Sequence, residues 1–237
     1  MSLAQQLPHP FTLARTLYFD TVLCQLCRDV PAVREQADAA ITVATAQRFV
    51  LMQALGPIMR GWAIVVQEHS TEGLVQIRQG LDADRSTGAE AQRPYLLTLL
   101  AEASGLLGQP EGGLAALEEA LTLMEKTGER YYEAEWHRQR GELLLLCAAK
   151  SHPDGGSREQ HEAETCFQHA LDVARQQQAK SLELRAAMSL SRLWQRQGKC
   201  AQARVLPASL YGWFTEGFDT ADLQEAKALL DVLGEEP

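Results

Sequence analysis

A repeat of about 40 residues constrains the fold of this chain more than any other feature. The segments 19–41, 59–81 and 99–121 begin at equal intervals, and small residues recur in them at matching positions. A repeat of this length is typical of proteins whose units cannot bury an apolar face alone and therefore pack against their neighbours. The matching positions are Thr21, Gly61 and Ala101, then Val33, Gly73 and Gly113, then Ala40, Gly80 and Ala120.

The period continues beyond these segments with one interruption. Gly141 follows Ala101 at the same interval, and Ala203 follows Ala163 at the same interval again. Ala163 itself comes later than a strict period would place it. The stretch "KSHPDGGS" at 150–157 is rich in turn-forming residues, so we interpret it as an insertion loop in the fourth repeat.

Each repeat is predicted to contain two helices. Leu114, Leu117 and Leu121 are three or four residues apart, which places them on one helical face. Pro110 near the start and Gly128 just past the end are typical helix boundaries. The alternation expected of strands is absent. We therefore predict an all-α fold, a right-handed superhelical solenoid of about five helix-turn-helix repeats with a C-terminal capping helix.

The same pattern predicts the boundaries within the chain. An N-terminal extension covers 1–10, the repeats cover 11–218 with the loop at 150–157, and the capping helix with its tail covers 219–237. One face of the capping helix should be apolar and the other should lie in water, as the end of a solenoid requires. The apolar face is formed by Leu223, Ala226, Leu230 and Leu233, and the polar face by Asp222, Glu225, Lys227 and Asp231.

The segment "AETCFQHAL" at 163–171 raises the question of a metal site. Ala163, Phe167 and Ala170 match the packing positions of the other repeats, and Cys166 and His169 fall between them. Cys166 is therefore better explained as a small buried side chain than as a metal ligand.

Other candidate ligands also lack a complete pattern. Cys24 and Cys27 have the CxxC spacing, but a structural zinc site needs two more ligands and no second CxxC follows. His152, His161 and His169 match no structural or catalytic spacing, and the sequence contains neither a phosphate-binding loop nor a nucleophile elbow. We expect no metal, no cofactor and no catalysis by this segment. The alternative is an all-helical enzyme or metal-binding protein that uses the residues around 137–169.

The net charge of −9, with scattered Lys and Arg, argues against nucleic acid as a partner of this segment, because phosphate contacts need a concentrated basic face. No run of apolar residues is long enough for a membrane span, and the N-terminus does not resemble a signal peptide. An odd number of cysteines, five, favours a reducing compartment. These features together predict a cytoplasmic location.

The helix pairs resemble the tetratricopeptide repeat, and the longer period is similar to that of transcription activators of the MalT type. The phrases "RGWAIVVQ", "EGLVQIRQGL", "RPYLLTLLAEA" and "YGWFTEGFDTADLQEAKALL" resemble the C-terminal repeats of bacterial proteins that carry a class III adenylate/guanylate cyclase domain and an AAA/STAND-type ATPase. The resemblance implies a non-catalytic module that binds a protein, peptide or small effector and controls an attached cyclase, ATPase or transcriptional output domain.

In repeats of this type the first helix of each pair lines an inner groove, which gives a set of candidate binding residues. The groove should be aromatic at its N-terminal end and cationic at its C-terminal end, suited to an acidic or C-terminal peptide. Two alternatives stay open: the aromatic residues pack between repeats, or the arginines form surface ion pairs with Glu102, Glu142 and Glu183. The candidates are Tyr18, Trp62, Tyr95, Glu102, Arg138, Glu142, Arg185, Arg192 and Gln195.

The predicted helix 11–28 has more apolar residues than one partner helix can cover. Exposed apolar patches of that kind favour association with a second surface. We expect a homodimer through this N-terminal edge, or contact with upstream domains of the same protein. The residues are Phe11, Leu17, Phe19, Leu23 and Leu26.

Overall fold

The computed structural model describes residues 9–151 and 157–235, and in these ranges all regular secondary structure is helical. The predicted all-α class is confirmed. Most of the predicted N-terminal extension and the centre of the predicted insertion loop, residues 152–156, lie outside the described residues. Lys150 and Ser151 end one helix and Ser157 begins the next, so those ends of the predicted loop are helical.

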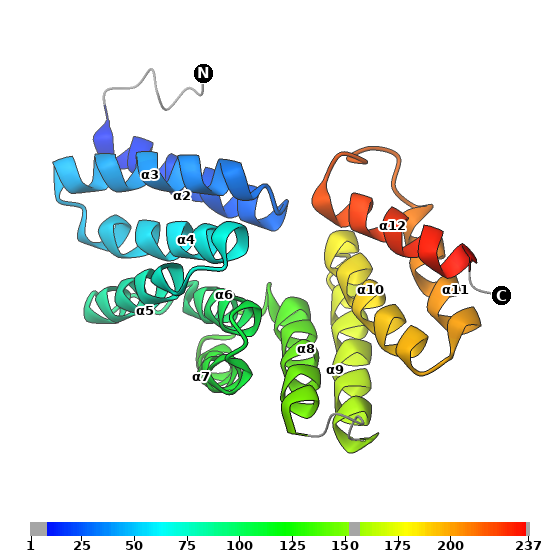
Figure 1. Cartoon of the computed structure of the whole chain (residues 1–237). Coiled ribbons are helices and arrows are strands. Elements are labelled where there is room, and N and C mark those ends of the chain that lie inside the picture. Colours follow the sequence, from blue (N-terminus) through cyan, green and yellow to red (C-terminus); the bar gives the residue numbers. More distant parts are fainter. Residues whose placement is uncertain (1–8, 152–156, 236–237) are drawn as a thin grey trace. The chain divides into compact units, whose positions relative to one another are not determined.

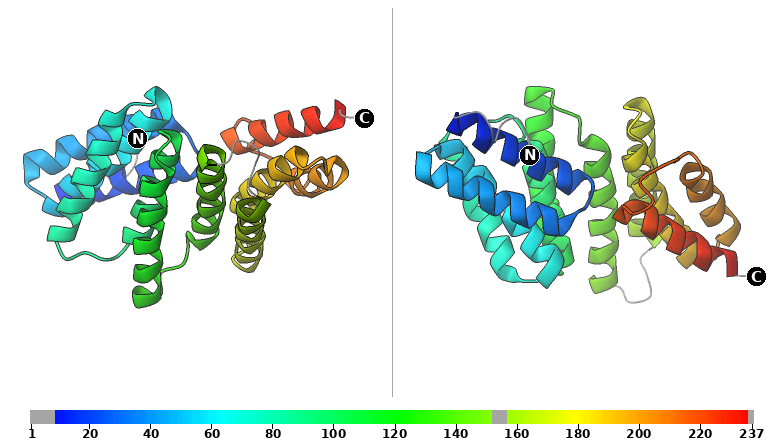
Figure 2. Two further views of the ribbon diagram at one scale, coloured as in Figure 1. Left: turned by 60° about the horizontal axis from the view of Figure 1, so that its bottom comes forward. Right: turned by 90° about the horizontal axis from the view of Figure 1, so that it is seen from above.

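The described helices form five consecutive pairs followed by one further helix (Figure 1). The members of four pairs, α2 with α3, α4 with α5, α8 with α9 and α10 with α11, pack side by side (Figure 2). The pairs are α2 (Pro10–Leu26) with α3 (Val30–Gln47), α4 (Val50–Glu68) with α5 (Thr71–Ser86), α6 (Arg93–Leu106) with α7 (Pro110–Thr127), α8 (Glu133–Ser151) with α9 (Ser157–Gln176), and α10 (Lys180–Arg196) with α11 (Cys200–Tyr211); α12 (Ala221–Glu235) follows.

The chain divides into two compact units. Unit 1 comprises Met1–Gln109 and Glu118–Glu129, and unit 2 comprises Pro110–Leu117 and Arg130–Pro237. Unit 1 therefore contains α2 to α6 and most of α7, and unit 2 contains the start of α7 and α8 to α12. The right-handed superhelical course of the whole chain stays a prediction.

In unit 1 the small residues of the repeat allow close contact between helices. A Cβ atom at Gly61 would lie 2.5 Å from the carbonyl oxygen of Gly73, and one at Gly73 would lie 2.4 Å from that of Gly61. The backbones of α4 and α5 therefore touch at a point where no larger residue fits. Repeats of this length match at these positions because both helices need a small residue at their crossing point.

Helix α4 is long and apolar enough to cross a membrane, judged by its length and composition. No such helix was expected from the sequence, so this expectation was wrong. Most of the helix is buried inside unit 1, with Ile58, Met59 and Trp62 almost fully covered. A core helix of a folded domain passes the same test, and α4 packs as one, between α3, α5 and α6.

In unit 2 the segment "AETCFQHAL" packs as the repeat pattern predicts. Ala163, Phe167 and Ala170 are fully buried, and the Phe167 ring lies against Gly141 of α8. A Cβ atom on Gly141 would lie 2.5 Å from that ring. Cys166, one position before Phe167, is also buried.

The terminal helix α12 differs from its prediction at two positions. Leu223, Ala226 and Leu233 are buried as expected, but Leu229 is buried in preference to the half-buried Leu230. Asp222 was expected on the wet face and is buried. The reason is a buried partner on α10, described below.

The outer face of α2 is partly apolar. Phe19 is 43% exposed and Leu23 is 60% exposed, and the guanidinium of Arg15 lies 5.5 Å from the centre of the Phe19 ring. Phe11 is also exposed but packs edge-on against Phe49. The predicted edge is smaller than expected, because Leu17 is buried and Leu26 is half-buried.

Candidate functional site

The predicted groove residues belong to both compact units, so the two sets are described separately. Tyr18, Trp62, Tyr95 and Glu102 lie in unit 1. The remaining candidates, Arg138, Glu142, Arg185, Arg192 and Gln195, lie in unit 2.

The aromatic candidates of unit 1 are buried, which corrects the prediction that they line an accessible groove. Tyr18, Trp62 and Tyr95 are each at most 2% exposed. Each has a polar partner, so its single polar group stays satisfied inside the unit. The bonds are Tyr18 Oη to Gln92 Oε1, Trp62 Nε1 to Glu102 Oε2 and Tyr95 Oη to Gln25 Oε1, all 2.8 Å long.

Glu102 is the half-buried member of this set. Its carboxylate accepts the indole N–H of Trp62, which lies one repeat earlier in the chain. Burial raises the pKa of Tyr18, and the charges of Asp84 and Glu129 raise it further. Tyr18 is therefore a neutral hydrogen-bond donor in the core of unit 1, and not a group that titrates near neutral pH.

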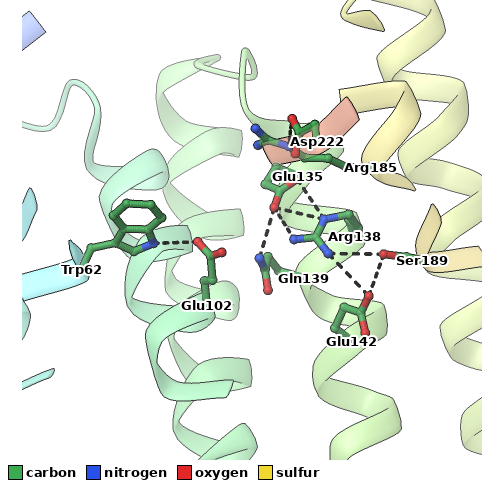
Figure 3. A network of polar contacts seen from close by, with 9 residues as sticks. All are labelled: Trp62, Glu102, Glu135, Arg138, Gln139, Glu142, Arg185, Ser189 and Asp222. Carbon is green, nitrogen blue, oxygen red and sulfur yellow. Dashed lines mark hydrogen bonds and ion pairs between the residues drawn. The ribbon is translucent and has the colours of Figure 1, made fainter. Parts of the chain in front are cut away.

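In unit 2 a buried carboxylate organises the polar residues (Figure 3). Glu135 on α8 is 3% exposed and accepts hydrogen bonds from Arg138 Nη2 at 2.6 Å and Nε at 3.0 Å. Gln139 Nε2 donates to the same carboxylate at 3.1 Å. Burial alone would raise the pKa of Glu135, but the positive charges of Arg138 and Arg185 and these hydrogen bonds hold it below its usual range.

The cluster extends from α8 to α10. Arg138 Nη1 donates to Ser189 Oγ at 3.3 Å and lies 3.5 Å from Glu142 Oε1. Ser189 in turn donates its hydroxyl proton to Glu142 Oε1 at 2.6 Å. Glu142 is the most accessible member, with 36% of its side chain exposed. The buried residues Glu135 and Ser189 thus fix the positions of Arg138 and Glu142, which reach the surface.

A second buried pair joins α10 to α12. Arg185 Nε donates to Asp222 Oδ2 at 2.8 Å, and both side chains are less than a tenth exposed. Burial opposes the charge on Arg185, but the charges of Asp222 and Glu135 outweigh it and raise the pKa of the guanidinium. Arg185 is therefore a structural residue, which corrects its prediction as a groove residue.

Arg192 is the one predicted arginine that is well exposed. Arg192 Nη2 lies 3.4 Å from Glu225 Oε2 of α12, and each side chain is about 40% exposed. Gln195, one turn later on α10, is half-buried. Helix α10 packs against both α8 and α12. The face formed by these three helices therefore presents Glu142, the edge of Arg138, Arg192 and Glu225, and we call it the α8–α10–α12 face.

The predicted cationic end is instead a set of ion pairs. The alternative of pairing with glutamates is closer to the structure, but it named only one correct partner, Glu142. Glu183 binds Arg175 and Lys180. Sequence reasoning missed Glu135, Ser189 and Asp222. The helical spacing of three between Glu135 and Arg138 was a usable signal for the first of these; the other two partners come from different helices.

No three of the described histidines and cysteines in the region 137–169 converge on one point. The rings of His137 and His169 stack with their centres 5.5 Å apart. Burial, and then the charges of His169, Arg140 and Arg130, lower the pKa of His137 to about 4. Burial raises the pKa of the Cys166 thiol. Within residues 9–151 and 157–235 no three His, Cys, Asp or Glu side chains are grouped so that they could hold a metal ion. Cys24, Cys27, Cys147 and Cys166 are free thiols.

Comparison with known protein families finds none that matches this chain. The chain is similar to an uncharacterized protein of Rhizobium meliloti (strain 1021), with 29% identity over 136 residues. The matched region covers 57% of this chain but only 12% of that protein. Sequence of this kind therefore also occurs as a small portion of a much longer chain.

Proposed function

We propose that this chain is a non-catalytic interaction module that binds a protein or peptide segment through the α8–α10–α12 face of unit 2. The observation that carries the proposal is that α10 makes polar contacts on both sides: Ser189 with Arg138 and Glu142 of α8, and Arg192 with Glu225 of α12. The partly exposed groups of these contacts project from three helices. Hydrogen bonds to the buried Glu135 and Ser189 hold Arg138 and Glu142 in place, and Arg192 and Glu225 pair with each other.

The chemistry of this face favours a partner that presents both donors and acceptors. Exposed ion pairs contribute little to stability, at most about 1 kcal/mol, so a partner can separate Arg192 from Glu225 at small cost. Arginine can then hold a carboxylate or a backbone carbonyl of the partner in two hydrogen bonds. The buried Glu135 and Ser189 order Arg138 and Glu142 before a partner arrives, which reduces the entropy that these two side chains lose on binding.

We further propose that the repeats are tetratricopeptide-like and that the module serves a larger bacterial cytoplasmic signalling protein. The regularly spaced helix pairs and the small share of the longer relative that is matched support this reading. In that setting the module would control a cyclase, an ATPase or a transcriptional output domain.

The proposal can be tested by selecting peptides from a random display library with the whole chain. Bound peptides are then measured against Arg192→Ala and against Arg158→Ala. Arg158 is a matched control, because it forms an exposed ion pair with Glu162 on α9 of the same unit. We expect Arg192→Ala to weaken binding about tenfold and Arg158→Ala to leave it unchanged. Selected peptides that bind both variants equally would place the contact surface elsewhere.

A further inference from the structure

A cavity of about 310 Å³ in unit 1 lies outside the α8–α10–α12 face. Its walls come from the end of α5, the connection 88–90, the start of α6 and the middle of α7. A volume of this size is at the lower end of the range for small-molecule sites. The side chains that define its chemistry are Arg85, Glu90, Arg93, Glu119 and Thr122.

Arg93 is fixed in the cavity wall by buried acceptors. Its Nη1 atom donates to the carbonyl oxygen of Leu81 at 3.0 Å and to Asp84 Oδ2 at 3.1 Å. Only 6% of the Arg93 side chain is exposed. Because these bonds already hold the guanidinium, little conformational entropy of Arg93 is lost when a ligand binds.

Glu119 lies between two arginines. Its Oε1 atom accepts a hydrogen bond from Arg85 Nη2 at 2.8 Å and another from Arg93 Nη2 at 3.1 Å. Burial alone would raise the pKa of Glu119, but the two guanidiniums outweigh it and hold that pKa below its usual range. Proteins commonly bind carboxylates and phosphates through hydrogen bonds from arginine side chains, as Arg85 and Arg93 bind Glu119 here.

The charges around the cavity show what happens when Glu119 moves away. Its side chain is 39% exposed, so it can rotate into solvent while α7 stays folded. Arg93 keeps Asp84 as its partner, and Lys126 keeps Glu90. Three cations then face two carboxylates, which leaves the single positive charge of Arg85 without a counterpart at the mouth of the cavity.

We propose that this cavity binds a small organic or inorganic oxyanion between Arg85 and Arg93, and that Glu119 occupies the place of the anion when no ligand is bound. The ligand class is a carboxylate or a phosphate, which share the geometry that a guanidinium fork recognises. The hydroxyl of Thr122 on the adjoining wall donates to the carbonyl oxygen of Glu118, so the two arginines are the donors that an anion would meet. The inference does not depend on the proposed peptide-binding function, because all the residues that carry it lie in unit 1.

Isothermal titration calorimetry with sodium succinate and with inorganic phosphate, at constant ionic strength, tests the proposal. The proteins are the unchanged chain, Glu119→Gln, Arg85→Gln and the control Arg34→Gln, which alters an exposed ion pair with Glu68 in the same unit. We expect Glu119→Gln to bind one of the two anions about tenfold more tightly than the unchanged chain, because it removes the internal competitor. Arg85→Gln should bind at least about tenfold more weakly, and Arg34→Gln should match the unchanged chain.

The two anions distinguish a carboxylate ligand from a phosphate ligand. Circular dichroism of each variant confirms that the fold is retained, as the half-exposed position of Glu119 and the exposed position of Arg85 lead us to expect. The proposal is overturned if neither anion binds to Glu119→Gln. It is also overturned if Arg85→Gln and Arg34→Gln bind equally well, since the binding would then be adventitious.

Discussion

Arg185 and Asp222 form a buried ion pair, 2.8 Å long, that joins the terminal helix α12 to α10. The two residues are 37 positions apart in the sequence. Helix α12 therefore does more than cover the end of an apolar core. Its first turn supplies the carboxylate that neutralises a buried guanidinium.

Removing this carboxylate should destabilise unit 2. Asp222→Ala removes this carboxylate from the buried Arg185, and the loss of one partner of a buried pair costs about 3 kcal/mol. Urea unfolding followed by circular dichroism measures the change. Asp231→Ala, on the exposed face of the same helix, is the control and should change the free energy of unfolding by less than about 0.5 kcal/mol.

Adding one methyl group where α4 and α5 touch should also be costly. Gly61→Ala places a Cβ atom 2.5 Å from the Gly73 carbonyl oxygen, so the two helices must move apart. Overpacking of this kind costs about 1–3 kcal/mol. Gly212→Ala is a suitable comparison because its nearest contact would be an ordinary 3.5 Å. Equal melting temperatures for the two variants would contradict the close approach of the helices.

Arg138 should matter for stability as well as for binding. A surface ion pair, one of the two roles that the sequence left open for Arg138, would contribute little to stability. The structure predicts a larger contribution, because Arg138→Ala removes two hydrogen bonds and the opposite charge from the buried Glu135 carboxylate. We expect a loss of about 3 kcal/mol at pH 7, measured by urea unfolding, with Arg192→Ala close to the unchanged chain.

The effect of Arg138→Ala should depend on pH. The pKa of Glu135 is lower in the folded chain than its ordinary value of 4.5. Such a group stabilises the fold above its unfolded pKa, and that stabilisation is lost as the pH falls through the folded value. The difference between the variant and the unchanged chain should therefore shrink below about pH 4.5. A difference that stays constant down to about pH 3 would show that Arg138 acts through packing alone.

His137 should make the fold less stable in mild acid. Its pKa falls from 6.5 to about 4 on folding, so the unfolded chain takes up a proton first. Stability is unaffected above pH 6.5, declines as the pH falls below it and reaches its full loss near pH 4. Melting temperatures of His137→Gln between about pH 7 and pH 5 should decline less than those of the unchanged chain. His161→Gln, at an exposed position on α9, should follow the unchanged chain.

The exposed apolar side chains of α2 should promote self-association, probed by light scattering at high concentration. Leu23 is 60% exposed, and Phe19 lies one turn before it. Leu23→Lys introduces a charge that a second copy would have to bury, so the variant should be monomeric at concentrations where the unchanged chain is dimeric. If light scattering gives the same mass for Leu23→Lys and for the unchanged chain, this edge is not the interface.

The helical class, the length of the repeat and the positions of closest packing were predictable from the amino-acid sequence. Gly61, Gly73 and Gly141 could be identified in advance because a helix crossing point admits only a small residue, and that requirement repeats with the chain. Burial of Phe167 against Gly141 followed from the same periodicity. Packing of this kind depends on side-chain size at fixed spacings, and both can be read from the sequence.

Which polar groups are accessible to a partner could not be predicted from the sequence. Trp62 and Arg185 occupy positions that the repeat assigns to a groove, but their burial depends on Glu102 and Asp222 from other helices. The pairing of Arg93 with Asp84 and Glu119, on which the anion cavity rests, likewise joins three helices. A charged side chain is buried or exposed according to the partners that distant segments bring to it, and no local pattern in the sequence records those partners.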